Sequence, residues 1–363
     1  MSKKIIIAGG GTGGHIFPAI AIANALKILD SSIDILFIGA KGKMEMEKIP
    51  QAGYSIVGLD ITGFNRSSLI KNIGLPFKLL KSFFQVRNIF NSFKPTAVIG
   101  VGGYSTFPVL RFAQSKCIPT FIHESNSFAG KSNVMLGKNA NKIFVAGKGM
   151  EQFFPKDKIV ITGNPIRKKI AQSTVSTSEG VSFFGLDTNK KTILAVGGSL
   201  GAKSINEALA NHIDEFEKNN LQLIWQTGTT TFQHYKNLAE GRKNIWCNAF
   251  IKEMEMAYAA ADIIISRAGA MAVAEICVAA KPTVFVPFPL AAEDHQTINA
   301  MYLVNQQAAL MVNDSEAKKE LVSIVIALSK DEAQQKVLSK NCQSLAVVNA
   351  DEMIAKQILN CIE

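Results

Sequence analysis

The sequence predicts an α/β protein with two domains, each built on a doubly wound parallel β-sheet. The chain has 363 residues, which is long for one domain and sufficient for two. Short apolar runs alternate with helix-length segments along the chain, as in successive βαβ units. Residues 4–11 share a pattern with residues 191–198, since each stretch is an apolar strand that leads into a glycine loop. This pattern suggests a duplicated domain, and chance likeness between two such strands is the alternative.

The apolar runs predict seven strands in the first half of the chain and six in the second. The first seven cover residues 4–8, 34–38, 55–59, 97–101, 120–123, 142–145 and 159–161, with helices between them such as 17–29 and 106–116. The other six cover residues 192–196, 221–227, 245–248, 263–266, 283–286 and 309–312. We expect a domain boundary after residues 163–165, a surface loop at 173–180 and a last helix near 351–362.

The composition is that of a globular protein, with 47% hydrophobic and 19% charged residues. The five cysteines are odd in number and form no CxxC pair, so we expect reduced thiols and neither a disulfide framework nor a zinc site. The first apolar run is too short for a signal peptide, and no stretch approaches the ~20 apolar residues of a membrane span. We therefore expect a chain that is soluble or lies on a membrane surface without crossing it.

The chain is basic, with a formal net charge of +10. A basic surface favours anionic partners such as nucleic acid, phosphate-rich ligands or an anionic lipid leaflet. Nucleic acid is the least favoured of these, because the chain has neither a Lys/Arg-rich tail nor a recognisable nucleic-acid-binding module.

The first glycine loop, residues 9–14, follows a predicted strand and precedes a helix. It satisfies GxGxxG, but a dinucleotide site also needs an acidic residue at the end of the second strand, and residues 37–41 contain none. The loop therefore argues against a nicotinamide cofactor, although its glycines and the helix N-terminus still suit a close anionic ligand. His15 is either a general base or a helix-start residue with local hydrogen bonds, and its position alone does not choose between them.

Two further motifs come at strand ends. Gly102 and Gly103 place backbone amides beside a ligand, Tyr104 faces that ligand or packs, and Ser105 or Thr106 is expected to cap the next helix.

The residues His123, Glu124, Ser125 and Asn126 end the fifth predicted strand. Buried polar groups either pair with one another or meet a ligand, and we favour substrate contact. Since there is no HExxH pattern and no third clustered ligand, no metal site is predicted.

The second half contains another glycine loop at residues 197–202, without the Gly-Lys-Ser/Thr ending of a Walker A site. A helix is expected to begin near Gly269 and Ala270, where free amide groups suit a diphosphate. Glu275, in the second turn of that helix, is either a bidentate acceptor for sugar hydroxyls or a solvated charge. Residues 293–300 bring more polar groups to a strand end.

Two such domains leave a cleft at the carboxyl ends of their strands, where α/β proteins bind ligands. With several anion-type loops, no metal motif and no nucleophile elbow, the residues favour an enzyme that uses a nucleotide-diphosphate sugar.

The ordered motifs resemble those of the MurG family, the UDP-GlcNAc:undecaprenyl-diphosphoryl-muramoyl-pentapeptide GlcNAc transferases. They run along nearly the whole chain: GGGTGGHIFPAIAIA at the start, GVGGYSTFP, HESN, GNPIR at 163–167, GGSLGAKSIN, AFI around Phe250, SRAGAMAVAE and VPFPLAAEDHQTINA. The resemblance implies a GT-B fold and an inverting β-1,4 transfer, in which the acceptor's C4 hydroxyl attacks the anomeric carbon of GlcNAc and UDP leaves. No cofactor and no metal ligand are predicted.

The resemblance also implies that the two domains bind different substrates. Residues 1–164 would bind the lipid acceptor and the membrane, residues 165–341 would bind UDP-GlcNAc, and residues 342–363 would pack back on the first domain. The implied partners are UDP-GlcNAc, the undecaprenyl-diphosphate-linked muramyl-pentapeptide, an anionic membrane surface, and cell-wall synthesis and division proteins, with no nucleic acid. The implied location is peripheral, at the cytoplasmic face of the inner membrane.

Carried over residue by residue, the resemblance implies roles in both domains. The donor sugar would contact Thr12, Gly13, Gly14 and Asn126, its diphosphate Arg167 and Ser199, its uracil the backbone of Ile251, and its GlcNAc hydroxyls Gln296 or the adjacent His295. The phosphates and ribose would lie against Ala270, Met271, Ala272, Val273, Ala274 and Glu275, with Glu275 on the ribose hydroxyls. His15 is the best candidate base, with Tyr104, His123 and Glu124 as acceptor-side partners, and the choice of base between His15 and Glu124 stays open.

Residues 75–93 are dense in apolar side chains, and five basic residues flank or interrupt them: Lys71, Lys78, Lys81, Arg87 and Lys94. Such a segment suits an anionic leaflet, where each Lys or Arg contributes ~1 kcal/mol. The alternative is an ordinary crossover helix packed on the sheet, and we expect one face to be core and the other to face the membrane.

Three other readings are open. A related transferase that acts on a diacylglycerol glycolipid would share the fold and the donor loops, but HESN and GVGGYSTFP favour the muramyl acceptor. A UDP-sugar epimerase would need no lipid patch, and a non-enzymatic membrane module would need no phosphate loops.

Overall fold

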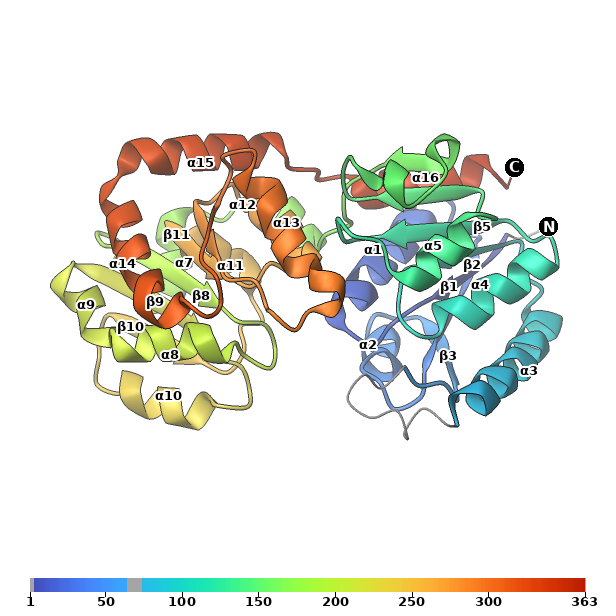
Figure 1. Cartoon of the computed structure of the whole chain (residues 1–363), viewed down its shortest axis with the longest axis horizontal. Coiled ribbons are helices and arrows are strands. Elements are labelled where there is room, and N and C mark those ends of the chain that lie inside the picture. Colours follow the sequence, from blue (N-terminus) through green and yellow to red (C-terminus); the bar gives the residue numbers. More distant parts are fainter. Residues whose placement is uncertain (1–2, 64–73, 363) are drawn as a thin grey trace. The chain divides into compact units, whose positions relative to one another are not determined.

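Each half of the chain folds around its own parallel β-sheet, with helices on both faces (Figure 1). The computed structural model describes residues 3–63 and 74–362. Unit 1 consists of Met1–Arg167 with Asn349–Glu363, and unit 2 is Lys168–Val348. The predicted α/β class, with two parallel-sheet domains, is confirmed.

The sheet of unit 1 has seven parallel strands in the order β3-β2-β1-β4-β5-β6-β7. Their bounds are β1 Lys4–Ala8, β2 Asp34–Ala40, β3 Ser55–Leu59, β4 Ala97–Gly100, β5 Thr120–Glu124, β6 Lys142–Val145 and β7 Ile159–Ile161. The strand order reverses between β1 and β4, which is the point of a doubly wound sheet where ligands bind. The two glycine loops predicted to meet a ligand follow these two strands.

The strands of unit 1 are apolar on both sides because helices cover both faces. Ile5 and Ile7 point into one core, and Ile6 and Ala8 into the other. The helices are α1 Gly13–Leu29, α2 Glu45–Gln51, α3 Leu75–Phe93, α4 Thr106–Ser115, α5 Lys131–Gly137 and α16 Ala350–Asn360, with short 3-10 turns at Met150–Gln152 and Lys156–Lys158.

The last helix, α16, returns to unit 1 and lies beside α1, so the two ends of the colour scale meet there (Figure 1). Ile354, Ala355 and Ile358 join the same core as Ile5 and Ile7. The returning segment was expected to start at residue 342, but residues 342–344 still belong to a helix of unit 2, and α16 begins at Ala350.

The sheet of unit 2 has six parallel strands in the order β10-β9-β8-β11-β12-β13, so its order reverses between β8 and β11. The strands are β8 Lys191–Val196, β9 Leu221–Gln226, β10 Ile245–Asn248, β11 Ile263–Ser266, β12 Thr283–Phe285 and β13 Leu310–Met311. The helices are α6 Lys168–Ala171, α7 Thr177–Phe183, α8 Lys203–Asn211, α9 Ile213–Lys218, α10 Phe232–Ala239, α11 Met254–Ala260, α12 Ala270–Ala279, α13 His295–Val304, α14 Ala317–Lys330 and α15 Glu332–Ser344, with a 3-10 turn at Ala292–Asp294.

Two local expectations were wrong. The predicted loop 173–180 contains the start of α7, because Ser176 and Glu179 form a reciprocal capping box that begins a helix. Ser105 and Thr106 do not cap α4 with their side chains. Their hydroxyls donate instead to the carbonyls of Ile38 and Ala8, which ties the loop after β4 to the ends of β2 and β1.

All five cysteines are free thiols.

Candidate active site

The two glycine loops of unit 1 interlock through their backbones. The Gly10 N–H donates to the Gly102 carbonyl at 3.1 Å. Gly103 has a φ of +93°, and a Cβ added there would lie 2.4 Å from the Gly10 oxygen. Only glycine therefore permits this approach of the loop after β4 to the loop after β1.

A buried carboxylate, that of Glu45, lies beneath the first loop. Its Oε2 accepts the Gly11 N–H at 2.8 Å, and its Oε1 accepts the Ala40 N–H at 3.0 Å. A Cβ on Gly10 would lie 2.3 Å from the carboxyl carbon, so the glycine makes room for the acid. Glu45 was not predicted as a site residue, since an acid among the charged side chains of residues 41–47 resembles a surface group.

His15, in the first turn of α1, is half-buried, and its Nδ1 lies 3.0 Å from the Gly10 carbonyl oxygen. A carbonyl oxygen only accepts, so Nδ1 carries the proton of this bond and Nε2 of the neutral ring carries the lone pair. A Cβ on Gly102 would lie 2.7 Å from Nε2, so the ring lies against the second loop. His15 therefore makes the local hydrogen bond that the sequence suggested, and the same bond sets the tautomer that a general base requires.

His123, on β5, is fully buried, and neither ring nitrogen has a hydrogen-bond partner among the described residues. Burial lowers its pKa to about 4. The Asn164 side chain, near but outside good hydrogen-bond geometry, acts in the opposite direction, and His15 lowers the pKa further. His123 is therefore a neutral ring near pH 7, and its predicted part in catalysis stays a prediction.

Glu124, at the end of β5, is buried and accepts four hydrogen bonds. Its Oε1 accepts the backbone and side-chain N–H groups of Asn126 at 3.1 and 3.2 Å, and its Oε2 accepts from Gly130 at 3.1 Å and Asn133 at 2.8 Å. These bonds occupy both oxygens, which favours Glu124 as the residue that orients Asn126 rather than as a base.

The other predicted residues of unit 1 lie around the start of α1 and the second loop. Thr12 is exposed, and Gly13 lies against the ring of Phe17, whose other neighbour is the Arg167 guanidinium, 5.8 Å from the ring centre. Tyr104 is half exposed and its ring covers Gly63.

In unit 2, the buried Gln226 braces the glycine loop after β8. Its side-chain amide donates to the Gly198 carbonyl at 3.1 Å and accepts the Ile251 N–H at 3.0 Å. The Ile251 N–H is thus already hydrogen-bonded to Gln226. The predicted contact of the Ile251 backbone with uracil therefore falls to its carbonyl group. Ser199, at the tip of the loop, is exposed.

The helix α12 starts at Ala270 without a side-chain cap, so its first N–H groups remain suited to an anion. The residues Ala270, Met271, Ala272, Val273 and Ala274 are all half-buried. Glu275 is buried and accepts the Tyr258 hydroxyl at 3.2 Å. The alternative that Glu275 is a solvated helix charge was wrong.

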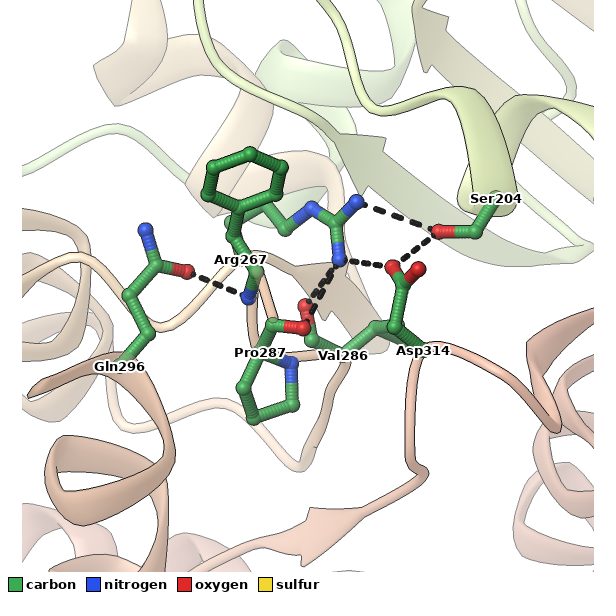
Figure 2. Close-up of polar contacts among 7 residues, drawn as sticks. Ser204, Arg267, Val286, Pro287, Gln296 and Asp314 are labelled. Atoms are coloured by element: carbon green, nitrogen blue, oxygen red, sulfur yellow. Dashed lines mark hydrogen bonds and ion pairs between the residues drawn. The ribbon is translucent and has the colours of Figure 1, made fainter. Parts of the chain in front are cut away.

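Arg267, which follows β11, joins three strand ends (Figure 2). Its guanidinium donates to the carbonyls of Val286 and Pro287 at 2.9 and 3.0 Å, pairs with Asp314, and donates to the Ser204 hydroxyl at 3.1 Å. The sequence marked the motif around Arg267 as a candidate ligand site, but it did not predict that Arg267 connects these strand ends.

The same guanidinium lies over the Phe288 ring, 5.5 Å from its centre, and the Phe288 N–H donates to Gln296 Oε1 at 3.0 Å (Figure 2). This bond uses the oxygen of the Gln296 amide and not its NH₂ group. His295 is half-buried beside it.

Comparisons with known proteins agree with this arrangement. The glycosyltransferase family 28 N-terminal domain matches residues 5–145, and the C-terminal domain of that family matches residues 192–358. A Flavobacterium psychrophilum UDP-N-acetylglucosamine–N-acetylmuramyl-(pentapeptide) pyrophosphoryl-undecaprenol N-acetylglucosamine transferase is 48% identical, covering 99% of this chain and 98% of its own. The Parabacteroides distasonis protein of the same name is 46% identical, with the same coverage. The crystal structure of Acinetobacter baumannii MurG matches with a TM-score of 0.80 and 30% identity over 99% of both chains.

The chain belongs to the MurG family.

Its GT-B fold is shared more widely than the family. The UDP-GlcNAc 2-epimerase of Neisseria meningitidis, solved with UDP-GlcNAc bound, matches with a TM-score of 0.67 at 15% identity over 99% of this chain and 100% of its own. At that identity the match shows the fold alone.

Groups of three or more His, Cys, Asp or Glu side chains that suit a metal ion do not occur in the described parts of this MurG-family chain.

Proposed function

We propose that this chain transfers GlcNAc from UDP-GlcNAc to the C4 hydroxyl of MurNAc-pentapeptide on undecaprenyl diphosphate, which forms the lipid-linked disaccharide of peptidoglycan synthesis. The relatives named for this reaction match the chain end to end at 46–48% identity. Diacylglycerol glycolipid synthesis and sugar epimerisation are not favoured, since the relatives at 46–48% identity are named for the muramyl-pentapeptide reaction and the matched epimerase, at 15% identity, shares the fold alone.

His15 is the proposed base. Its Nε2, left with the lone pair by the Nδ1–Gly10 bond, takes the proton of the acceptor hydroxyl. The oxygen then attacks the anomeric carbon from the face opposite UDP, and the C–O bond to the diphosphate breaks with its electron pair on UDP. Inversion at the anomeric carbon follows from this single displacement.

The proposed donor site lies in unit 2. The first amides of α12 and the Ser199 loop suit the diphosphate, since developing negative charge is stabilised by fixed N–H dipoles. Glu275 suits the ribose hydroxyls because a buried carboxylate is a strong paired acceptor. Arg167, Thr12, Gly13, Gly14 and Asn126 are proposed as donor contacts from unit 1, with Tyr104, His123 and Glu124 on the acceptor side.

The proposed location is the cytoplasmic face of the inner membrane, with α3 as the contact. Phe77, Leu80 and Phe84 are 59–77% exposed and lie one to two turns apart on one stripe of the helix, while Val86 and Phe90 on the opposite side are buried. None of the helices in the described ranges has the length and apolar character that a bilayer span needs. Cell-wall synthesis and division proteins are the proposed protein partners.

The test is UDP release from UDP-GlcNAc with a short-chain, soluble lipid-linked muramyl-pentapeptide, with the disaccharide identified by mass. His15→Ala should lower kcat by about 100-fold or more, which is the usual contribution of a general base, while UDP binding is retained. His234→Ala, an exposed histidine of unit 2, is the matched control. Turnover on a diacylglycerol, or on UDP-GlcNAc alone, would replace this proposal with glycolipid synthesis or epimerisation.

A further inference from the structure

A single peptide group lies between His15 and Glu45. The Gly10 carbonyl accepts from His15 Nδ1 at 3.0 Å, and the N–H of the same peptide, on Gly11, donates to Glu45 Oε2 at 2.8 Å. The amide is delocalised, so a negative charge at its N–H makes its carbonyl oxygen a stronger acceptor. The electrostatic influence of Glu45 therefore reaches the imidazole through one covalent unit.

The site is shaped around this carboxylate. Glu45 is 1% exposed, and a Cβ on Gly10 or on Gly39 would lie 2.3 or 2.5 Å from its side chain. Its two oxygens accept backbone N–H groups, and none of the ion pairs in the described ranges involves it. Amide donors stabilise the charge without cancelling it, so the carboxylate still favours positive charge nearby.

We propose that Glu45 is a positioning residue of the transfer reaction, which holds the His15 proton on Nδ1 through the Gly10–Gly11 peptide and stabilises the imidazolium formed during the reaction. The inference rests on the proposed role of His15. In that step Nε2 gains the proton of the acceptor hydroxyl and the ring becomes cationic. The new C–O bond forms as the bond to UDP breaks, and UDP keeps the electron pair.

Neither His123 nor Arg167 supplies a negative charge to His15. His123, on β5, stays neutral near pH 7. Arg167 lies over the ring of Phe17, on the same helix as His15, and as a cation it opposes a second positive charge. Glu45 is the carboxylate that hydrogen bonds connect to the imidazole through one peptide group.

A purely structural role is the alternative, since Glu45 also fixes the conformation of the glycine loop. The two roles differ in what they do to the pH dependence of His15. A brace supports the loop at any pH, whereas an electrostatic partner shifts the pH at which the ring takes up a proton.

The experiment uses the full chain with Glu45→Gln, Glu45→Asp and the control Glu47→Gln, which removes a carboxylate from the exposed side of α2. The kcat is measured against pH, and the ring ¹⁵N signals are recorded with His15→Gln for assignment. We expect E45Q to lower kcat about 10-fold or more and to move the acidic limb of the profile and the His15 ring titration to lower pH by about half a unit or more. The limb moves down because a lost negative charge makes the imidazolium easier to deprotonate.

E45D keeps the charge, so its profile should lie closer to the parent than that of E45Q, although the shorter side chain disturbs the loop. E47Q should match the parent. An unchanged ring titration and acidic limb in E45Q would leave Glu45 as a loop brace only. A His15 ring protonated on Nε2 in the parent would overturn the proposal even if no Glu45 variant folds. Absence of acceptor-dependent UDP release in the parent would instead refute the proposed function, and the ring titration would still test the link.

Discussion

At the residue scale, polar side chains hold the loops that carry the candidate site residues of each unit. Glu45 and Glu124 each hold backbone amides of a loop at a strand end in unit 1. In unit 2, Gln226 and Arg267 instead donate to backbone carbonyls of the loops after β8 and β12. The groups proposed for catalysis and ligand binding are thus held by neighbours whose own positions are determined by hydrogen bonds.

The buried His123 predicts a pH dependence of stability. Its pKa is about 4 in the folded chain against 6.5 for an unperturbed ring, mainly because of burial. The unfolded state therefore binds the proton first, so this contribution is present above pH 6.5 and is lost as the pH falls towards 4. Between pH 7 and pH 5 the loss is about 2 kcal/mol.

Urea unfolding of the full chain at pH 7 and pH 5 measures this loss. Amide hydrogen exchange monitors the unfolding of unit 1 within it. His123→Leu should lose less stability than the parent over the same interval, while the exposed His234→Leu should behave like the parent. Equal losses in His123→Leu and the parent would assign the pH dependence to other groups.

Glu275 predicts a selective effect on the donor. Glu275→Gln should weaken UDP binding by about 10-fold, because a hydrogen bond to a charged group contributes about 1.5 to 3 kcal/mol. Isothermal titration with UDP measures it. Tyr258→Phe, which removes the hydroxyl donated to Glu275 at 3.2 Å, should have a smaller effect. An unchanged affinity in Glu275→Gln would place the ribose elsewhere.

At the element scale, α3 has two faces with different roles. Val86 and Phe90 pack into the core of unit 1, while Phe77, Leu80 and Phe84 are exposed. Lys81 pairs with Asp60 at 3.0 Å, and hydrogen bonds from Lys41 and Lys81 lower the pKa of Asp60 to about 2. The sequence expectation of one core face and one outward apolar face is confirmed, and membrane contact stays a proposal.

The exposed face predicts lipid binding. Phe77→Ser with Leu80→Ser should weaken binding to vesicles of anionic lipid, measured by sedimentation, by about 100-fold or more, because about 1.5 to 3 kcal/mol is lost for each large apolar side chain removed from the bilayer. Val337→Ser with Val348→Ser, 48% and 55% exposed in unit 2, is the matched control. Equal loss in both double variants would remove α3 as the contact.

Helix and strand ends show where local patterns suffice. The apolar runs predicted all thirteen strands to within two residues at either end, because buried parallel strands are apolar throughout. The start of α7 was missed although Ser176 and Glu179 carry a recognisable capping pattern.

At the scale of the whole molecule, the chain crosses between its units twice, so that its first and last residues both belong to unit 1. The helix α16 completes the core beside α1, so unit 1 is built from both ends of the sequence. The stability of unit 1 should therefore depend on α16, although this helix is far in sequence from the other core residues of the unit.

Ile358, fully buried in that core, tests this dependence. Ile358→Ala should destabilise unit 1 by about 2 to 4 kcal/mol through the cavity left behind, and UDP affinity should remain at the parent value if the donor binds unit 2. Thermal unfolding and titration with UDP measure the two quantities. Lys356→Ala, exposed on the same helix and paired with Glu352, should cost less than about 0.5 kcal/mol. A lost UDP affinity in Ile358→Ala would argue against donor binding by unit 2 alone.

The sequence by itself determined the fold class, the strands and the motifs that carry the family resemblance. These depend on local features: apolar runs that bury on both faces, and glycines such as Gly103 whose backbone conformation other residues rarely adopt. Only the tertiary structure decided that Glu45 contacts the loop of His15, that Glu275 is buried, that Arg267 joins three strand ends and that α16 packs on α1. Those facts depend on which strand ends the topology brings together. A charged residue carries no local mark that tells a surface group from a buried partner more than thirty positions away.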